Sequence, residues 1–175
     1  GGSGFLGQHC VSYFLESGAY VLSISRNDAL TKKSIPASAY EDFKYHLLQQ
    51  IKNFGATHLV NCWAMTDVRA CERDVRGAYL GNTVLASLVA SVSEASGVPL
   101  LHVSTDQVYG GLAKSGGKGW EIGEEAPITN YGCTKLFAEK YMENVEAWVL
   151  RANFVGLSKS SGARKNLLEW VLAEI

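Results

Sequence analysis

The chain has 175 residues, of which 47% are apolar and 19% are charged, and its formal net charge is −1. These values are typical of one ordinary globular domain, long enough to bury a real core. The near-neutral charge gives no support for nucleic acid or an anionic membrane surface as a partner. No apolar run approaches membrane-spanning length, and no secretory leader pattern is visible. The four cysteines lack a Cys-x-x-Cys pattern, so we expect a reduced, cytoplasmic protein with incidental thiols.

The chain opens on a glycine-rich loop, Gly1-Gly-Ser-Gly4-Phe-Leu-Gly7, and helical periodicity follows until Gly18. Glycines at this spacing let the backbone turn tightly and approach a pyrophosphate, which the N-terminus of the next helix attracts. The motif is weak without a preceding strand, so the loop alone fits a cofactor site or a plain helix cap. The chain starts inside this loop and stops within an apolar helical pattern, so both ends look cut. We therefore expect a strand of about five apolar residues directly before Gly1 in the intact protein.

Residues 19–25 form a short apolar run that predicts a buried strand, which gives the loop–helix–strand order of a βαβ unit. The position just beyond such a strand meets the adenosine ribose, where an acidic residue suits NAD and an arginine suits the 2′-phosphate of NADP. Arg26 stands there, with Asp28 close behind. A guanidinium binds phosphate well, so NADP is favoured over NAD, although a surface arginine remains the alternative.

Strands and helices alternate along the rest of the chain, which predicts an α/β fold with a doubly wound parallel sheet. Helices are predicted over residues 40–54, 75–96, 130–144 and 165–175, and strands over 57–61, 98–104 and 147–151. Asp42 is expected to cap the first of these helices, with a contact to an adenine as the alternative. Asn82 lies in the apolar pattern of the second and needs a partner if buried, either a neighbouring backbone group or a water near Lys135.

The most informative segment is Tyr131-Gly-Cys-Thr-Lys135, because a tyrosine and a lysine four residues apart share one face of a helix. A free tyrosine titrates near pH ~10, and a nearby ammonium lowers that pKa toward the working range. Such a pair can exchange a proton with a carbonyl or alcohol oxygen. Thr105, just after the apolar strand 98–104, could supply a hydroxyl to the same oxygen. By itself Tyr-x-x-x-Lys is common on solvated helix faces, so the other motifs of the chain are needed to interpret it as a catalytic pair.

The glycine loop, the hydroxyl-bearing strand end and Tyr-x-x-x-Lys, in this order, resemble the extended short-chain dehydrogenase/reductase family. Within that family the chain is most similar to the dTDP-4-dehydrorhamnose reductase branch. The similar segments are residues 1–7, 61–72, 104–110, 130–135 and 151–156. The resemblance implies that residues 1–175 form one NAD(P)-binding Rossmann-like domain, incomplete at both ends. The first strand and the C-terminal substrate-binding part would lie outside the chain, which leaves the sugar open.

The resemblance also implies roles for individual residues. Thr105 would hydrogen-bond the reacting oxygen of the substrate, and Tyr131 would be the general acid. Lys135 would lower the pKa of Tyr131 and hold the nicotinamide ribose. Tyr131, Lys135 and Arg26 would contact the cofactor together with Gly1, Gly4, Phe5, Leu6, Gly7 and Ala64. Cys62 and Trp63 stand where the family more often has alanines, so Trp63 could reshape the cofactor wall.

Together these features predict an NADP-preferring reductase of a 4-keto nucleotide sugar, with hydride from the nicotinamide and a proton from Tyr131. Two alternatives stay open. An NAD-dependent nucleotide-sugar epimerase or dehydratase needs further acid/base residues near Thr105, and Asp106 is a candidate. A non-catalytic, cofactor-binding regulatory subunit could keep the same motif. The expected partner is a small molecule, with no metal, nucleic acid or membrane involved, and a homodimer is compatible with the resemblance.

Overall fold

The computed structural model describes residues 1–25, 37–110 and 124–156. The chain divides into two compact units, Gly1–Pro36 with Asn153–Ile175, and Ala37–Ala152. Arg26, the predicted helix 165–175 and residues 111–123 of the long loop lie outside the described residues. In the described ranges, no helix combines the length and the apolar character needed to cross a membrane.

The larger unit is built on a parallel sheet with the strand order β1-β2-β3. The strands span Leu59–Asn61, Leu100–Ser104 and Ala147–Arg151. Parallel neighbours need a crossover connection, and helices lie between consecutive strands in the sequence, as such connections require. The α/β class and the three strands predicted in this unit are therefore confirmed, and β3 keeps its predicted bounds.

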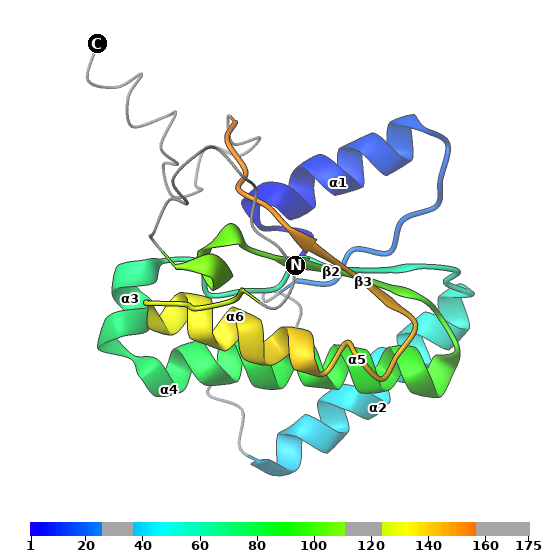
Figure 1. The fold of residues 1–175 in the computed structure, drawn as a ribbon. Coiled ribbons are helices and arrows are strands. Elements are labelled where there is room, and N and C mark those ends of the chain that lie inside the picture. The colour runs from blue at the N-terminus through cyan, green and yellow to red at the C-terminus, as the bar shows by residue number, and fades with distance from the viewer. Residues whose placement is uncertain (26–36, 111–123, 157–175) are drawn as a thin grey trace. The chain divides into compact units, whose positions relative to one another are not determined.

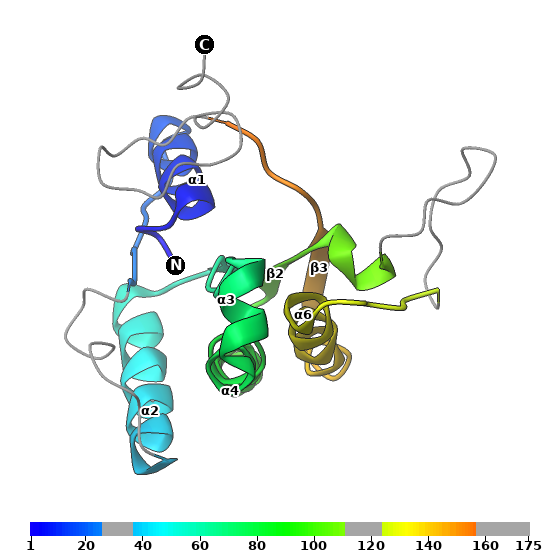
Figure 2. The same cartoon turned by 90° about the vertical axis from the view of Figure 1, so that its left-hand side faces the viewer.

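Helices cover one face of this sheet (Figure 1). They are α2 (Ala37–Phe54), α3 (Val68–Arg73), α6 (Asn130–Lys140) and a continuous run of α4 (Val75–Ala78), the π-helical turn η1 (Tyr79–Val84) and α5 (Leu85–Ser96). Figure 2 looks along the helices and shows α2, α4 and α6 side by side in one layer. The predicted helix 75–96 is confirmed, and Gly97 ends it in the left-handed conformation at φ 67°.

The central strand β2 sends alternate side chains to the two faces of the sheet. Leu100, His102 and Ser104 are buried on one face, whereas Leu101 and Val103 are only half-buried on the other. Both α5 and α6 contact β2, so the buried set lies beneath the helical layer. Two of these three side chains are polar, which concentrates polar groups between the sheet and α6.

The larger unit differs from the sequence prediction in three local details. The helix predicted from residue 40 begins at Ala37 as α2, so Asp42 lies inside it and cannot be its N-cap. The short helix α3 was not predicted, although Asp67 carries its signal: the Asp67 carboxylate accepts a hydrogen bond from the Ala70 N–H at 3.0 Å. Helix α6 also ends four residues earlier than its predicted end at residue 144.

The smaller unit contains the glycine loop and helix α1 (Phe5–Glu16). Residues 19–25 have no regular secondary structure, so they do not form the predicted strand. The Ile24 carbonyl accepts hydrogen bonds from the N–H groups of Gly1 at 2.6 Å and Gly2 at 3.3 Å. A strand requires a neighbouring strand that continues this ladder, and the described part of this unit supplies none. The strand prediction is therefore wrong for this structure.

Candidate active site

Helix α6 carries the two residues of the Tyr-x-x-x-Lys motif on its buried face. Tyr131 is 8% exposed and Lys135 is 1% exposed, and Glu139 follows one turn later at 7%. The three side chains are spaced four residues apart, so they form one stripe along the helix. On a solvated helix face the lysine and the glutamate would be exposed to water, so the interpretation of the motif as a solvent-exposed helix face is excluded.

The start of α6 is fixed by its own N-cap and by contacts with two other segments. The Thr129 hydroxyl accepts a hydrogen bond from the Gly132 N–H at 3.0 Å, and the Glu72 carboxylate of α3 accepts one from the Asn130 N–H at 2.7 Å. A Cβ added at Gly132 would lie 2.6 Å from the Gln107 carbonyl oxygen. Glycine at this position therefore lets α6 pack directly against the backbone that follows β2.

That close packing brings Thr105 to Tyr131. Thr105 lies just after the C-terminal end of β2, where ligands bind in open parallel sheets, and it is 3% exposed. Its hydroxyl donates to Asp106 Oδ1 at 3.2 Å and accepts from the Gln107 N–H at 3.3 Å. A hydrogen bond between Thr105 and Tyr131 also lowers the pKa of the phenol.

The net effect of the surroundings nevertheless raises the pKa of Tyr131. Burial is the largest cause, because the phenol packs in a core cluster with Cys71 and Ala78, and the hydrogen bond with Thr105 opposes it only in part. Lys135 is not among the groups that shift this pKa. The expectation that Lys135 lowers the Tyr131 pKa therefore needs correction for this structure, in which the phenol stays protonated at neutral pH.

The reason lies in the direction that the Lys135 side chain takes. Its Nζ donates to the Val103 carbonyl oxygen at 2.6 Å and lies 3.3 Å from His102 Nε2. Burial lowers the pKa of Lys135 to about 8, while Glu139 and then Cys62 act in the opposite direction. Lysine thus changes its charge close to physiological pH at this site.

His102 is a site residue that the sequence did not reveal. It is fully buried, and burial, followed by the charge of Lys135, lowers its pKa to about 3. The ring is therefore neutral at pH 7. The available signal was a histidine at an inward-facing position of an otherwise apolar strand, because such a group needs polar partners when buried.

Asn82 forms the predicted tie to a neighbouring backbone group. It is fully buried in the π-helical turn η1. Its Oδ1 accepts from the Met65 N–H at 2.6 Å, and its Nδ2 donates to the Met65 carbonyl at 3.2 Å and to Thr134 Oγ1 at 3.0 Å. These bonds connect the segment after β1, which includes half-buried Ala64, to α6. Single π-helical turns of this kind frequently occur at functional sites.

Trp63 points toward α2, where its ring lies 5.4 Å from the Phe43 ring, measured between centroids. Phe43 is 3% exposed, so the large indole extends the core between β1 and α2. Its backbone N–H donates to Asn61 Oδ1 at 3.0 Å. The indole thus has a packing role in this structure.

The glycine loop of the smaller unit packs tightly against itself and leads directly into helix α1. Gly4 is the N-cap of α1 and offers no side-chain cap, so the first N–H groups of the helix are left for another acceptor. A Cβ at Gly7 would collide with the Gly1 carbonyl and lie 2.7 Å from Gly2 Cα. Half-buried Phe5 and Leu6 form the first helical turn. The uncapped start of α1 is compatible with an anion such as a pyrophosphate, while Arg26 lies outside the described residues.

A parallel sheet, a hydroxyl at the end of its central strand and a buried Tyr-x-x-x-Lys helix define a Rossmann-like domain of the extended short-chain dehydrogenase/reductase type. More specifically, residues 1–173 match the family model described as the RmlD substrate binding domain, and the chain belongs to that family.

Two curated relatives illustrate the sequence similarity. The probable low-salt glycan biosynthesis reductase Agl14 of Haloferax volcanii is 32% identical over 111 residues, covering 62% of this chain and 36% of the relative. The dTDP-4-dehydrorhamnose reductase of Shigella flexneri is 28% identical over 123 residues, covering 69% and 40%. The chain thus spans 36% and 40% of the length of these two proteins.

Solved structures with 20–22% sequence identity show the same fold. A dTDP-4-dehydrorhamnose reductase from Clostridium acetobutylicum matches with a TM-score of 0.78 over 99% of this chain and 57% of its own. The Bacillus anthracis enzyme of that name, in complex with NADP, gives 0.70 over 86% and 50%. The UDP-glucose 4-epimerase of Thermotoga maritima, with UDP-glucose, gives 0.79 over 97% and 59%.

Proposed function

We propose that this chain provides the cofactor-binding and proton-donating part of an NADP-preferring reductase that acts on a 4-keto nucleotide sugar. The observation that carries the proposal is that Thr105 and Tyr131 are both buried, Thr105 lies at the C-terminal end of β2, and Thr105 lowers the pKa of the phenol. Membership of the RmlD substrate binding domain family, together with relatives named as reductases, supports the substrate class.

The side chains of the larger unit have complementary roles in this proposal. A nicotinamide cofactor supplies the hydride when it is bound. Thr105 would turn its hydroxyl proton from Asp106 to the keto oxygen, and Tyr131 would donate its phenolic proton to the same oxygen. Because burial raises the pKa of Tyr131, the phenol carries that proton at neutral pH. Burial of both groups also keeps competing water away from the proton donor.

The glycine loop of the smaller unit would hold the pyrophosphate of the cofactor, because glycines at positions 1, 4 and 7 would let the backbone approach it closely. In the larger unit, Ala64 stays a predicted cofactor contact. The preference for NADP rests on Arg26, and the NADP complex of the Bacillus anthracis structure is consistent with it. NAD remains the alternative cofactor.

Asp106 supports a second candidate function, an NAD-retaining nucleotide-sugar epimerase or dehydratase. Its Oδ1 accepts a hydrogen bond from Thr105, so a further acid/base group lies beside the proposed substrate oxygen. Such an enzyme returns its hydride and consumes no NADPH, whereas a reductase consumes one NADPH for each product. A regulatory subunit would bind the cofactor and consume none.

The deciding experiment measures NADPH oxidation by the intact protein with dTDP-, UDP- and GDP-linked 4-keto sugars, and with the matching 4-hydroxy sugars as controls. Stoichiometric NADPH consumption with a keto sugar alone supports the reductase. Sugar conversion without net NADPH consumption supports the epimerase or dehydratase. Cofactor binding without conversion of any sugar contradicts both enzymes.

A further inference from the structure

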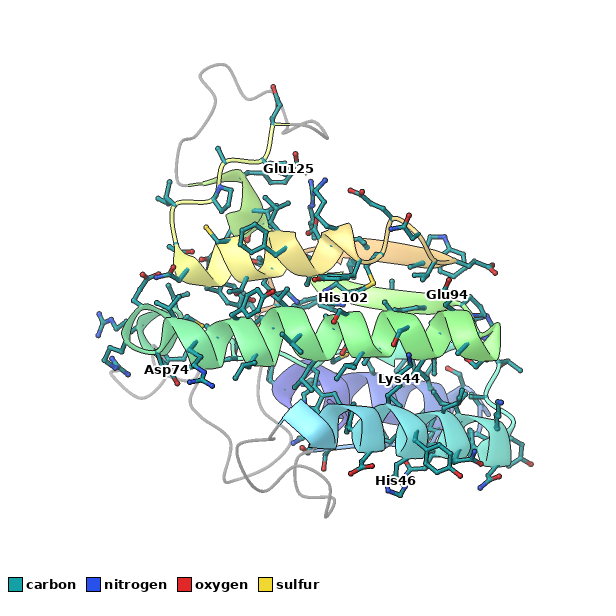
Figure 3. The ribbon with its side chains drawn as sticks, turned by 90° about the horizontal axis from the view of Figure 1, so that it is seen from below. Lys44, His46, Asp74, Glu94, His102 and Glu125 are labelled. Atoms are coloured by element: carbon teal, nitrogen blue, oxygen red, sulfur yellow. The ribbon has the colours of Figure 1, made fainter. Side chains whose placement is uncertain are left out.

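A chain of buried polar groups runs behind the Tyr-x-x-x-Lys motif, and the proposed reaction does not use its first members. The sheet register pairs Asn61 of β1 with His102 of β2, and both side chains face the helical layer. Figure 3 looks onto that layer and shows His102 at the line where α5 and α6 run side by side. Asn61 Nδ2 lies 3.1 Å from His102 Nδ1, and His102 Nε2 lies 3.3 Å from Lys135 Nζ.

The direction of these hydrogen bonds follows from the backbone N–H of Trp63, which contacts Asn61. The Trp63 N–H can only donate, and it contacts Asn61 Oδ1 at 3.0 Å. The amide orientation of Asn61 is thereby settled, so its NH₂ group faces His102 Nδ1 and donates to it. Nδ1 must therefore carry a lone pair. A neutral imidazole then has its single proton on Nε2, the nitrogen that faces Lys135.

An N–H on Nε2 is satisfied only if Lys135 Nζ can accept a hydrogen bond. An ammonium has three donors and no acceptor, whereas a neutral amine has a lone pair. The Val103 carbonyl receives one N–H of Lys135 at 2.6 Å in either charge state. The chain from Trp63 to Val103 is thus donor-to-acceptor at every step only when Lys135 is uncharged.

We propose that His102 is a positioning residue for Lys135, held by Asn61 in its Nε2–H tautomer so that its ring donates to Lys135 and favours the neutral amine. Protonation of Lys135 would place an N–H and an ammonium against each other inside the protein. The ring therefore adds to the effect of burial in favouring the uncharged lysine.

The charged and titratable groups around the pair are consistent with this arrangement. Glu139, one turn along α6, and Cys62, just after β1, both raise the pKa of Lys135, yet burial outweighs them and the pKa falls to about 8. Glu139 also has stronger partners elsewhere: it forms an ion pair with Arg151 of β3 at 2.6 Å and accepts a hydrogen bond from Ser104. His102 itself stays neutral because burial lowers its pKa, and the charge of Lys135 lowers it further whenever the lysine is protonated.

The consequence for the reaction, which rests on the proposed function, concerns the charge of the site. The pH at which Lys135, one helical turn from Tyr131, loses its positive charge should appear in the pH profile of kcat. The tautomer of His102 does not depend on turnover, so it can be tested separately from the activity.

The test is a nitrogen-15 NMR measurement on the histidine rings of the intact protein, combined with a carbon-13 titration of the lysine ε-carbons. We expect Lys135 to titrate near pH 8. Above that pH, where Lys135 is neutral, we expect a neutral His102 ring in the Nε2–H tautomer. An Nδ1–H tautomer at His102 above that pH, or a Lys135 that stays charged up to its ordinary pKa near ~10.4, would overturn the proposal.

Two variants reverse or remove the effect. Asn61→Asp places an acceptor against Nδ1, so the ring should switch to the Nδ1–H tautomer and Nε2 should accept from Lys135. His102→Gln offers Lys135 an amide oxygen instead of an N–H. Each change should increase the proton affinity of Lys135 at least tenfold. The matched control is His58→Gln, because His58 is exposed and bonds only to the neighbouring Thr57 within the described contacts.

The tautomer of His102 and the titration of Lys135 distinguish the proposed effect from a general loss of structure. A higher Lys135 proton affinity in Asn61→Asp without a tautomer switch would show that added charge alone acts, and would contradict the proposal. If Asn61→Asp does not fold, the tautomer of the unmodified protein and the His102→Gln titration still decide. Failure of the NADPH assay together with an Nε2–H ring would reject the proposed function and leave this inference intact.

Discussion

Replacing Tyr131 by phenylalanine separates the chemical role of the phenol from its packing role. The ring is 8% exposed and packs in a cluster with Cys71 and Ala78, and Phe fills almost the same volume. The loss in folding free energy should be limited to the hydrogen bond with Thr105, about 0.5–1.5 kcal/mol. The loss in rate should be far larger, because general acid catalysis typically contributes about 100-fold to 10,000-fold, or ~3–5 kcal/mol of activation free energy.

Three measurements on Tyr131→Phe test this separation: NADPH affinity by fluorescence titration, kcat on the active keto sugar, and the free energy of unfolding in urea. NADPH affinity should remain nearly unchanged while kcat falls at least about 100-fold. Tyr141→Phe is the matched control, because Tyr141 follows the same helix and is 46% exposed. A kcat for Tyr131→Phe within about threefold of the unmodified protein would remove Tyr131 as the proton donor.

Three further changes probe the support around the site. Gly132→Ala should lower the free energy of unfolding in urea by about 1–3 kcal/mol, because the added Cβ would lie 2.6 Å from the Gln107 carbonyl oxygen. The control is Gly81→Ala, whose added Cβ has its nearest contact at 3.7 Å and should be tolerated. Arg151→Met should lower the free energy of unfolding by about 3–5 kcal/mol, because Glu139 is left buried without its cation. Recovery of that free energy in the double variant Arg151→Met/Glu139→Leu would support this explanation, and an equal loss in the single and double variants would contradict it. The pKa of His102 is lowered from 6.5 to about 3, so between these pH values the unfolded chain binds one proton that the folded chain does not. The free energy of unfolding should therefore fall as the pH decreases from 6.5, by up to about 1.4 kcal/mol per pH unit. His102→Gln should flatten that slope, and an unchanged slope would show that the ring does not cause it.

Local sequence patterns determined most of the elements of the larger unit. The alternation of apolar residues and the helix-ending Gly97 predicted the run 75–96 and strand β3 with their observed bounds. The four-residue spacing of Tyr131 and Lys135 placed both on one helix face, because that periodicity is a property of the helix itself. The fold class followed from the order of these elements.

Residues 19–25 show where such local reasoning stops. Their apolar pattern is that of a buried strand, yet they form none in the described structure. A strand is defined by the neighbour that completes its hydrogen bonds, and that neighbour is not encoded in the segment. The missed helix α3 differs, because the capping carboxylate of Asp67 was a local signal that could have been read.

The electrostatics of the site came only from the tertiary structure. The motif suggested that Lys135 acts on Tyr131, whereas the fold buries the phenol and turns the lysine toward Val103 and His102. Asn61 and His102 are 41 residues apart and meet because the β1–β2 register pairs them. A pKa depends on burial and on every neighbouring charge and dipole, and these are set by strand register and helix packing, which bring together residues that are distant in the sequence.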